Sequence, residues 1–94
     1  MKKFDLNDLF YLIDRLRDPD LGCEWDINQD LHTIVKFALE EVYEVVDAVE
    51  KNNYLDLKEE LGDLLFQVIF MCKLADEKKL FNFDEVAAEL VAKL

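Results

Sequence analysis

The sequence predicts an all-α fold of four helices, with an antiparallel central helix pair and two copies of the chain packing into a helix bundle. Two glycines and one proline among 94 residues leave few turns, which suits a few long helices better than many short strands. The apolar fraction of 52% is ample for a core. Acidic residues recur three and four positions apart within apolar segments, which is the period of a helix. We expect one domain spanning residues 1–94.

The first helix is predicted over residues 6 to 16, because its apolar residues recur at helical spacing. Asp5 is the expected N-cap, since its carboxylate can accept from the free amides of the first turn. Pro19 and Gly22 then predict a loop that continues to about Trp25.

The second helix is predicted over residues 28 to 51. A strand over residues 42 to 49 is conceivable, because several side chains there are β-branched. However, the acidic residues Glu40, Glu44 and Asp47 recur at spacings of four and three rather than two, which favours a helix.

The third helix is predicted over residues 56 to 79, after a short turn at Asn52 and Asn53. Asp56 and Glu59 have the spacing of a capping box at its start. Because the turn is short, the second and third helices should be antiparallel neighbours.

The centre of the third helix, residues 64 to 72, is apolar nearly all the way round and should be buried on every side. Four helices have difficulty enclosing it, so we expect a homodimer or a higher homo-oligomer. The last helix should begin after Asn82, with Glu85 at the capping-box position. It reaches Leu94 without a C-cap signal, which is the pattern expected of a chain cut within or just after this helix.

The charge balance excludes several partners. The net charge of −11 argues against nucleic acid, which needs a basic footprint, and against an anionic membrane surface. The two cysteines, Cys23 and Cys72, lie in different contexts and indicate neither a disulfide framework nor a zinc site. Two reduced thiols in a cytoplasmic protein are the expectation.

Two acidic clusters carry the candidate chemistry. Carboxylates three positions apart share one helix face, and an antiparallel pair of helices would turn the two acidic faces toward each other. Such a cluster is costly in an apolar setting unless a cation compensates it, and oxygen ligands favour Mg²⁺ or Mn²⁺. The clustered residues are Glu40, Glu41, Glu44, Glu60 and Asp63, and Gln67 extends the second pair.

Two other interpretations compete with this one. Acidic residues on helices are most often solvated surface groups, although the pairing of two clusters weakens that interpretation. A di-iron carboxylate bundle would require Glu-x-x-His pairs on two helices. The only histidine, His32, has Gln29 three positions before it, so the di-iron interpretation is weak.

The acidic pattern, Glu40-Glu41-x-x-Glu44 followed after 15 residues by Glu60-x-x-Asp63, resembles the signature of the MazG family of nucleotide pyrophosphohydrolases. That pattern is shared with all-α dUTPases, dCTP pyrophosphatases and phosphoribosyl-ATP pyrophosphatases. Two further segments point to MazG. Residues 23 to 26 resemble the family's Cys-Pro-Trp-Asp segment, and residues 57 to 68 resemble its second metal-binding helix. The likeness covers nearly the whole chain.

The resemblance implies hydrolysis of a nucleoside triphosphate between the α and β phosphates, giving a monophosphate and pyrophosphate. It implies Glu41, Glu44, Glu60 and Asp63 as Mg²⁺ ligands. Glu40 would be an extra ligand or the base that orients or deprotonates the attacking water.

Four residues are predicted to contact the substrate. Trp25 could stack on the base, although a tryptophan is more often a core or interface anchor. Lys36 and Lys58 could reach phosphates, with a solvated surface role as the alternative. Lys93 would be the last trace of the basic stretch with which family members usually continue. The chain departs from the family at Glu24, where the family has proline, so this loop is expected to be less rigid.

Two rival functions remain open at this stage. One is a narrower deoxynucleotide hydrolase acting on dUTP or dCTP, which differs only in base recognition. The other is a non-catalytic acidic helical module that binds divalent ions or a protein partner.

Overall fold

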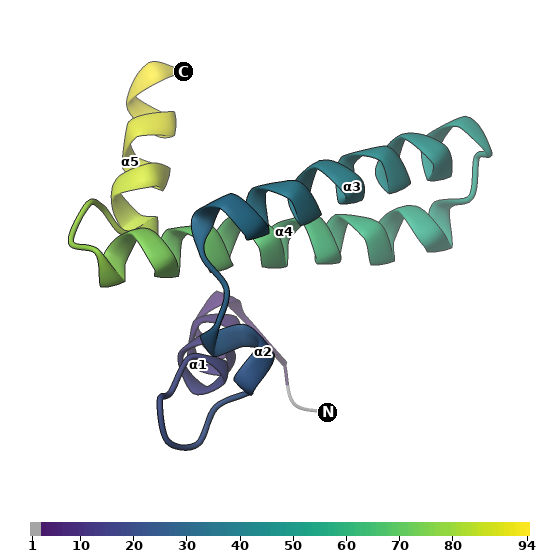
Figure 1. The fold of residues 1–94 in the computed structure, drawn as a ribbon. Coiled ribbons are helices and arrows are strands. Elements are labelled where there is room, and N and C mark those ends of the chain that lie inside the picture. The colour runs from purple at the N-terminus through teal and green to yellow at the C-terminus, as the bar shows by residue number, and fades with distance from the viewer. Residues whose placement is uncertain (1–2) are drawn as a thin grey trace.

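The computed structural model describes residues 3–94, and within that range every regular element is a helix (Figure 1). The all-α prediction is therefore confirmed for the described residues. The long helices α3 and α4 form an antiparallel hairpin, α1 and α2 lie against its open end, and α5 leaves the end of α4 at a steep angle (Figure 1). The helices are α1 (Leu6–Leu16), α2 (Glu24–Ile27), α3 (Leu31–Glu50), α4 (Tyr54–Glu77) and α5 (Phe83–Lys93).

The four predicted helices are present, and the one-turn helix α2 is a correction to the expected loop. Pro19 and Gly22 do lie in irregular backbone, but the chain coils again from Glu24 instead of staying open through Trp25. Four residues are too few to show helical periodicity in a sequence, so no pattern announced this turn.

Capping side chains set where the helices begin. Asp5 caps α1 and Asn82 caps α5, as predicted. Asp30 caps α3, which therefore starts three residues later than expected. Asn53 caps α4 by accepting from the Asp56 amide at 3.2 Å, so the predicted capping box at Asp56 is wrong and the helix starts two residues earlier.

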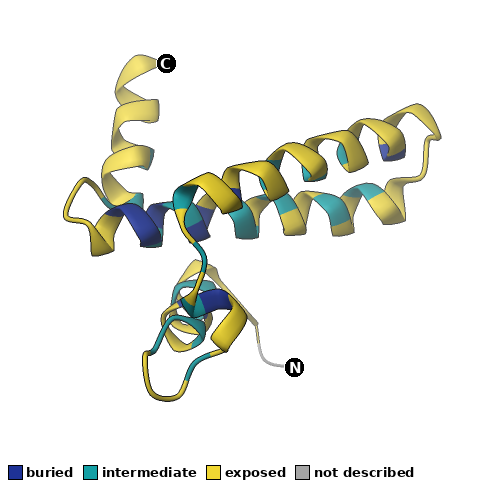
Figure 2. Ribbon diagram, viewed as in Figure 1, coloured by how far each residue is buried: buried dark blue, intermediate teal, exposed yellow. Residues whose placement is uncertain are grey.

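The hydrophobic core lies where α1 and the start of α5 meet the open end of the hairpin. This end carries most of the burial, whereas the outer faces of the hairpin and most of α5 are exposed (Figure 2). The buried cluster comprises Ile13, Ile34, Ile69, Phe70 and Leu74.

The centre of α4 is not buried on every side within one chain. Leu65 and Val68 are 40% and 36% exposed, Leu61 just before this stretch is 48% exposed, and Tyr43 on α3 is 66% exposed. The single chain therefore leaves an apolar face uncovered along the hairpin. No helix in residues 3–94 has the length and apolar character needed to cross a membrane.

Candidate metal centre

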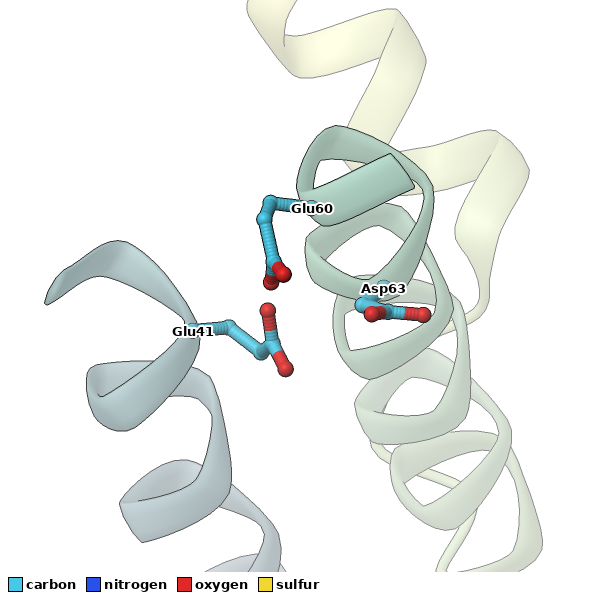
Figure 3. Close-up of side chains that lie close together, drawn as sticks. All are labelled: Glu41, Glu60 and Asp63. Atoms are coloured by element: carbon cyan, nitrogen blue, oxygen red, sulfur yellow. The ribbon is translucent and has the colours of Figure 1, made fainter. Parts of the chain in front are cut away.

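Three carboxylates from the two helices of the hairpin converge on one point. Glu41 projects from α3 toward Glu60 and Asp63 of α4 (Figure 3). One oxygen from each of the three side chains lies within 4.8 Å of the others. The predicted pairing of the two acidic clusters is therefore present in the geometry, with these three residues at its centre.

The position of Glu41 follows from the repeat of the buried face of α3. Glu41 is seven residues after Ile34 and seven before Ala48, and both of these are buried. Seven residues are close to two helical turns, so all three side chains point toward α4. Glu41 thus occupies a position that an apolar side chain would take in an ordinary hairpin.

The same repeat places the two carboxylates of α4. Asp63 is seven residues before the fully buried Phe70. Glu60 is seven before Gln67 and fourteen before the buried Leu74. Glu60 is half-buried and Asp63 is exposed, so the acidic group continues the inward-facing surface of the hairpin toward its turn and reaches solvent at Asp63.

The electrostatics of the group are unfavourable for three free carboxylates. Burial raises the pKa of Glu41 from 4.5 to about 7, helped by a hydrogen bond to Glu60 and by repulsion from Glu60, Asp63 and Glu44. The buried oxygen Oε2 of Glu41 has no hydrogen-bond partner. The ion pairs of residues 3–94 all lie elsewhere, so no lysine or arginine neutralises this group.

These features fit a hard divalent cation. The donors are all carboxylate oxygens, which Mg²⁺ and Mn²⁺ prefer, and an orphaned buried oxygen is a group that a cation would satisfy. Gln67 adds a neutral oxygen on the same face of α4, and its Oε1 is also buried without a partner. The sequence placed Gln67 beside the second cluster but gave it no role, although its seven-residue offset from Glu60 was readable.

The other predicted members of the site lie around this group. Glu44 is exposed one turn after Glu41, outside the converged group but close enough to raise the pKa of Glu41. Glu40 is exposed beside Glu41. Their parts as ligand and base stay predictions. His32 is exposed on α3.

An aromatic pair stands one turn along α3 from the acidic group. Trp25 of α2 packs against Phe37 of α3, with ring centroids 5.5 Å apart and planes inclined by 58°. Both rings are partly exposed, and Phe37 precedes Glu41 by four residues, so the pair lies on the side of α3 that carries the carboxylate. Sequence reasoning missed Phe37, because only the fold brings α2 against α3.

The predicted basic contacts are more dispersed. Lys36 and Lys58 are exposed on α3 and α4, and neither forms an ion pair with any described residue. Lys93 ends α5, whose C-terminal end stands off the hairpin (Figure 1). The single chain therefore does not gather its lysines around the carboxylates.

Residues 29–94 match the MazG nucleotide pyrophosphohydrolase domain. The chain is 46% identical over 86 residues to the nucleoside triphosphate pyrophosphohydrolase of Escherichia coli K12, covering 92% of this chain and 33% of that protein. It is 38% identical over 87 residues to the nucleoside triphosphate pyrophosphohydrolase/pyrophosphatase MazG of Thermotoga maritima, covering 93% and 34%. The chain thus spans about a third of the length of these curated relatives.

The fold is also similar to that of a solved protein. The crystal structure of a mazG-related protein from Thermotoga maritima superposes with a TM-score of 0.79 at 27% identity. The match covers 93% of this chain and 74% of the other. The similarity extends over the hairpin and the helices packed on it.

In buffer free of divalent ions, we expect the protein to lose stability as pH rises from about 4.5 to about 7. The unfolded chain releases the Glu41 proton near 4.5, whereas the folded protein holds it to about 7. Deprotonation in this window therefore favours unfolding, and the contribution of Glu41 is full below the window and lost above it. Denaturant titrations at several pH values in this range should show the free energy of unfolding falling with pH in wild type and in Glu89→Gln, which removes an exposed α5 carboxylate. Glu41→Gln should make this fall with pH smaller, and an unchanged pH dependence would contradict the pKa assignment.

Millimolar Mg²⁺ should raise the melting temperature of the protein. A ligand at a hundred times its dissociation constant stabilises the folded state by about 2.7 kcal/mol. Glu60→Gln should melt higher than wild type without metal, because a repelling charge is gone, and should respond less to Mg²⁺. Glu59→Gln, an exposed neighbour on α4, should respond like wild type. Melting curves of wild type that are indifferent to Mg²⁺ would rule out the site.

Proposed function

The chain belongs to the MazG nucleotide pyrophosphohydrolase family, and we propose that it hydrolyses nucleoside triphosphates between the α and β phosphates in a Mg²⁺-dependent reaction. The products would be a nucleoside monophosphate and pyrophosphate. The observation that carries the proposal is the convergence of Glu41, Glu60 and Asp63 at inward-facing positions without a compensating cation from the protein. The printed names of the relatives support the triphosphate as substrate.

Glu41, Glu60 and Asp63 would hold the Mg²⁺, with Glu44 joining them from the next turn of α3. Mn²⁺ meets the same ligand preference and could replace it. A bound divalent ion supplies charge neutralisation of the triphosphate and a lowered pKa for the attacking water. The carboxylates themselves fix where the polyphosphate sits, because a net charge of −11 would otherwise repel it.

The remaining site residues would complete binding and proton transfer. Glu40, exposed beside the group, would orient the attacking water and accept its proton. Trp25 would stack on the base, and Lys36 and Lys58 would reach the phosphates from the exposed flanks of α3 and α4. Lys93 would contribute only if an assembly brings the end of α5 back to a hairpin.

The acidic surface suits a small polyphosphate better than a polyanionic polymer or membrane, so we propose neither nucleic acid nor lipid as a partner. The thiols of Cys23 and Cys72 are both free, which is the state kept in a reducing compartment. We therefore place the protein in the cytoplasm, where it would remove surplus or non-standard nucleotides.

A product assay tests this function. Wild-type protein with each of several triphosphates, including dUTP and dCTP, should release pyrophosphate only when Mg²⁺ is present. Asp63→Asn should lower the rate by at least about a hundredfold, since it removes a ligand of the catalytic ion, and Glu59→Gln should not. Turnover confined to dUTP or dCTP would favour the narrower hydrolase. No pyrophosphate with any triphosphate would favour the non-catalytic module.

We also propose that a second copy of the chain covers the exposed apolar face of the hairpin, giving a homodimer or a higher homo-oligomer. Five of the exposed apolar side chains of α3 recur at steps of four, three, four and three, which is the spacing of a helix that packs lengthwise on another. Leu61, Leu65 and Val68 continue the face on α4 with steps of four and three. The α3 residues are Val35, Leu39, Val42, Val46 and Val49.

Sedimentation of the wild-type protein should therefore give at least twice the monomer mass of 11.1 kDa. Val42→Glu combined with Leu65→Glu should shift it to monomer, because each buried charge would oppose the interface. Leu12→Glu, which places the same charge on an exposed leucine of α1, should leave the assembly intact. A monomeric wild type would contradict the proposal.

A further inference from the structure

Arg17, at the C-terminal end of α1, joins three elements that are separate in the sequence. Its side chain is only 13% exposed. The Nε group donates to Oε2 of Glu77 on α4 at 3.0 Å, and Nη2 donates to the other oxygen of the same carboxylate. Nη1 donates to the carbonyl oxygens of Asp26 at 2.7 Å, Ile27 at 2.6 Å and Gln29 at 3.4 Å.

Helix α2 has little else to hold it in place. It is one turn long, too short to be stable alone, and its N-cap residue Cys23 makes no side-chain capping bond. It packs only weakly on the other helices. Arg17 therefore adds a side-chain donor to the Asp26 and Ile27 carbonyl oxygens at the end of α2.

The loop before α2 packs closely against the C-terminal end of α1. The Cys23 amide donates to the Leu16 carbonyl at 3.0 Å. Any side chain at Gly22 would collide with the carbonyl oxygens of Leu16 and Asp18. The entry to α2 is thus fixed by the loop, and its exit is fixed by Arg17.

What α2 carries toward the hairpin is Trp25, packed on Phe37. We propose that Arg17 is a positioning residue that fixes α2 so that Trp25 stays against Phe37, one helical turn from the acidic group. The consequence for catalysis rests on the proposed function, in which this tryptophan stacks on the base. The consequence for the aromatic pair itself does not.

The chemistry at position 17 requires arginine. A planar guanidinium can donate to a carboxylate from two nitrogens while its third nitrogen donates to backbone carbonyls, whereas a lysine ammonium is a compact point charge on a flexible stem. The hydrogen bond to Glu77 raises the pKa of Arg17 further above its ordinary value, so the guanidinium stays protonated across the physiological pH range. Arginine to lysine is therefore not a conservative change here.

A matched ion pair provides the control. Lys73 of α4 pairs with Asp14 of α1 at 2.9 Å and is likewise partly buried, but among the described residues no hydrogen bond or ion pair joins it to α2. Trp25 is the only tryptophan, so intrinsic fluorescence reports on this one ring. Arg17→Met should red-shift the emission as the ring leaves Phe37 for water, and Lys73→Met should not.

Steady-state kinetics give the second reading. With Arg17→Met, KM for the triphosphate should rise about tenfold with kcat unchanged, the equivalent of about 1.4 kcal/mol of lost binding. Arg17→Lys should give a smaller rise and a smaller red shift. Phe37→Ala should reproduce the red shift with the Arg17 contacts intact, which confirms what the emission reports.

The outcomes separate the two proposals. An unshifted emission in folded Arg17→Met, or an equal shift in Lys73→Met, would overturn the positioning role. Should Arg17→Met not fold, Glu77→Gln takes its place, with a red shift supporting the role and an unshifted emission overturning it. A wild type without any pyrophosphate release would overturn the proposed function, yet the fluorescence comparison would still decide whether Arg17 holds Trp25.

Discussion

Repulsion among carboxylates at inward-facing positions is the constraint on which the rest of this structure depends. Glu41 lies in line with Ile34 and Ala48, where an ordinary hairpin would bury an apolar side chain, and it faces two more acids from α4. The Oε2 atom of Glu41 is buried without a hydrogen-bond partner, and no cationic side chain among the described residues compensates the group. The local interactions therefore oppose folding in this half of the hairpin, so other parts of the molecule must hold the two helices together.

The packing is distributed accordingly. Ile13 and Phe70, with their neighbours from α1, α3 and α4, form the core at the open end of the hairpin. Toward the turn, Ala48 is the one buried residue on α3 beyond Glu41 in the described chain. Within one chain, the half of the hairpin that carries the acidic group is thus held by the turn and by contact between α3 and α4, and its apolar face is left uncovered. The proposed cation and the proposed second copy of the chain would each stabilise the same weakly packed half, and assembly would then be coupled to metal binding.

Much of this could be predicted from the sequence, because the signals were local. Helical periodicity located α1 and α3, turn and capping signals located α4 and α5, and the caps at Asp5 and Asn82 were readable from residue type and spacing. The pairing of Glu41 with Glu60 and Asp63 followed from two acidic faces and one short turn. The features that could not be predicted depend on contacts between residues far apart in the sequence. The i, i+3 spacing fits Glu44 as well as Asp63, and both residues are exposed, yet only Asp63 brings an oxygen within 4.8 Å of the Glu41 and Glu60 oxygens. The Arg17 contacts link residues as much as 60 positions apart and leave no periodic trace.

The raised pKa of Glu41 also ties metal binding to protons. A carboxyl group with a pKa of about 7 is largely protonated in mildly acidic solution, and a divalent cation must displace that proton to reach the oxygen. A cation bound by this group would therefore release a proton, and its affinity would fall as pH drops below about 7, well above the range in which an ordinary glutamate would compete. The same burial that destabilises the three carboxylates without a cation would thus make cation binding sensitive to pH near neutrality. A solvated acidic cluster on an exposed helix face would have neither property, and this difference distinguishes a built cation site from a merely acidic surface.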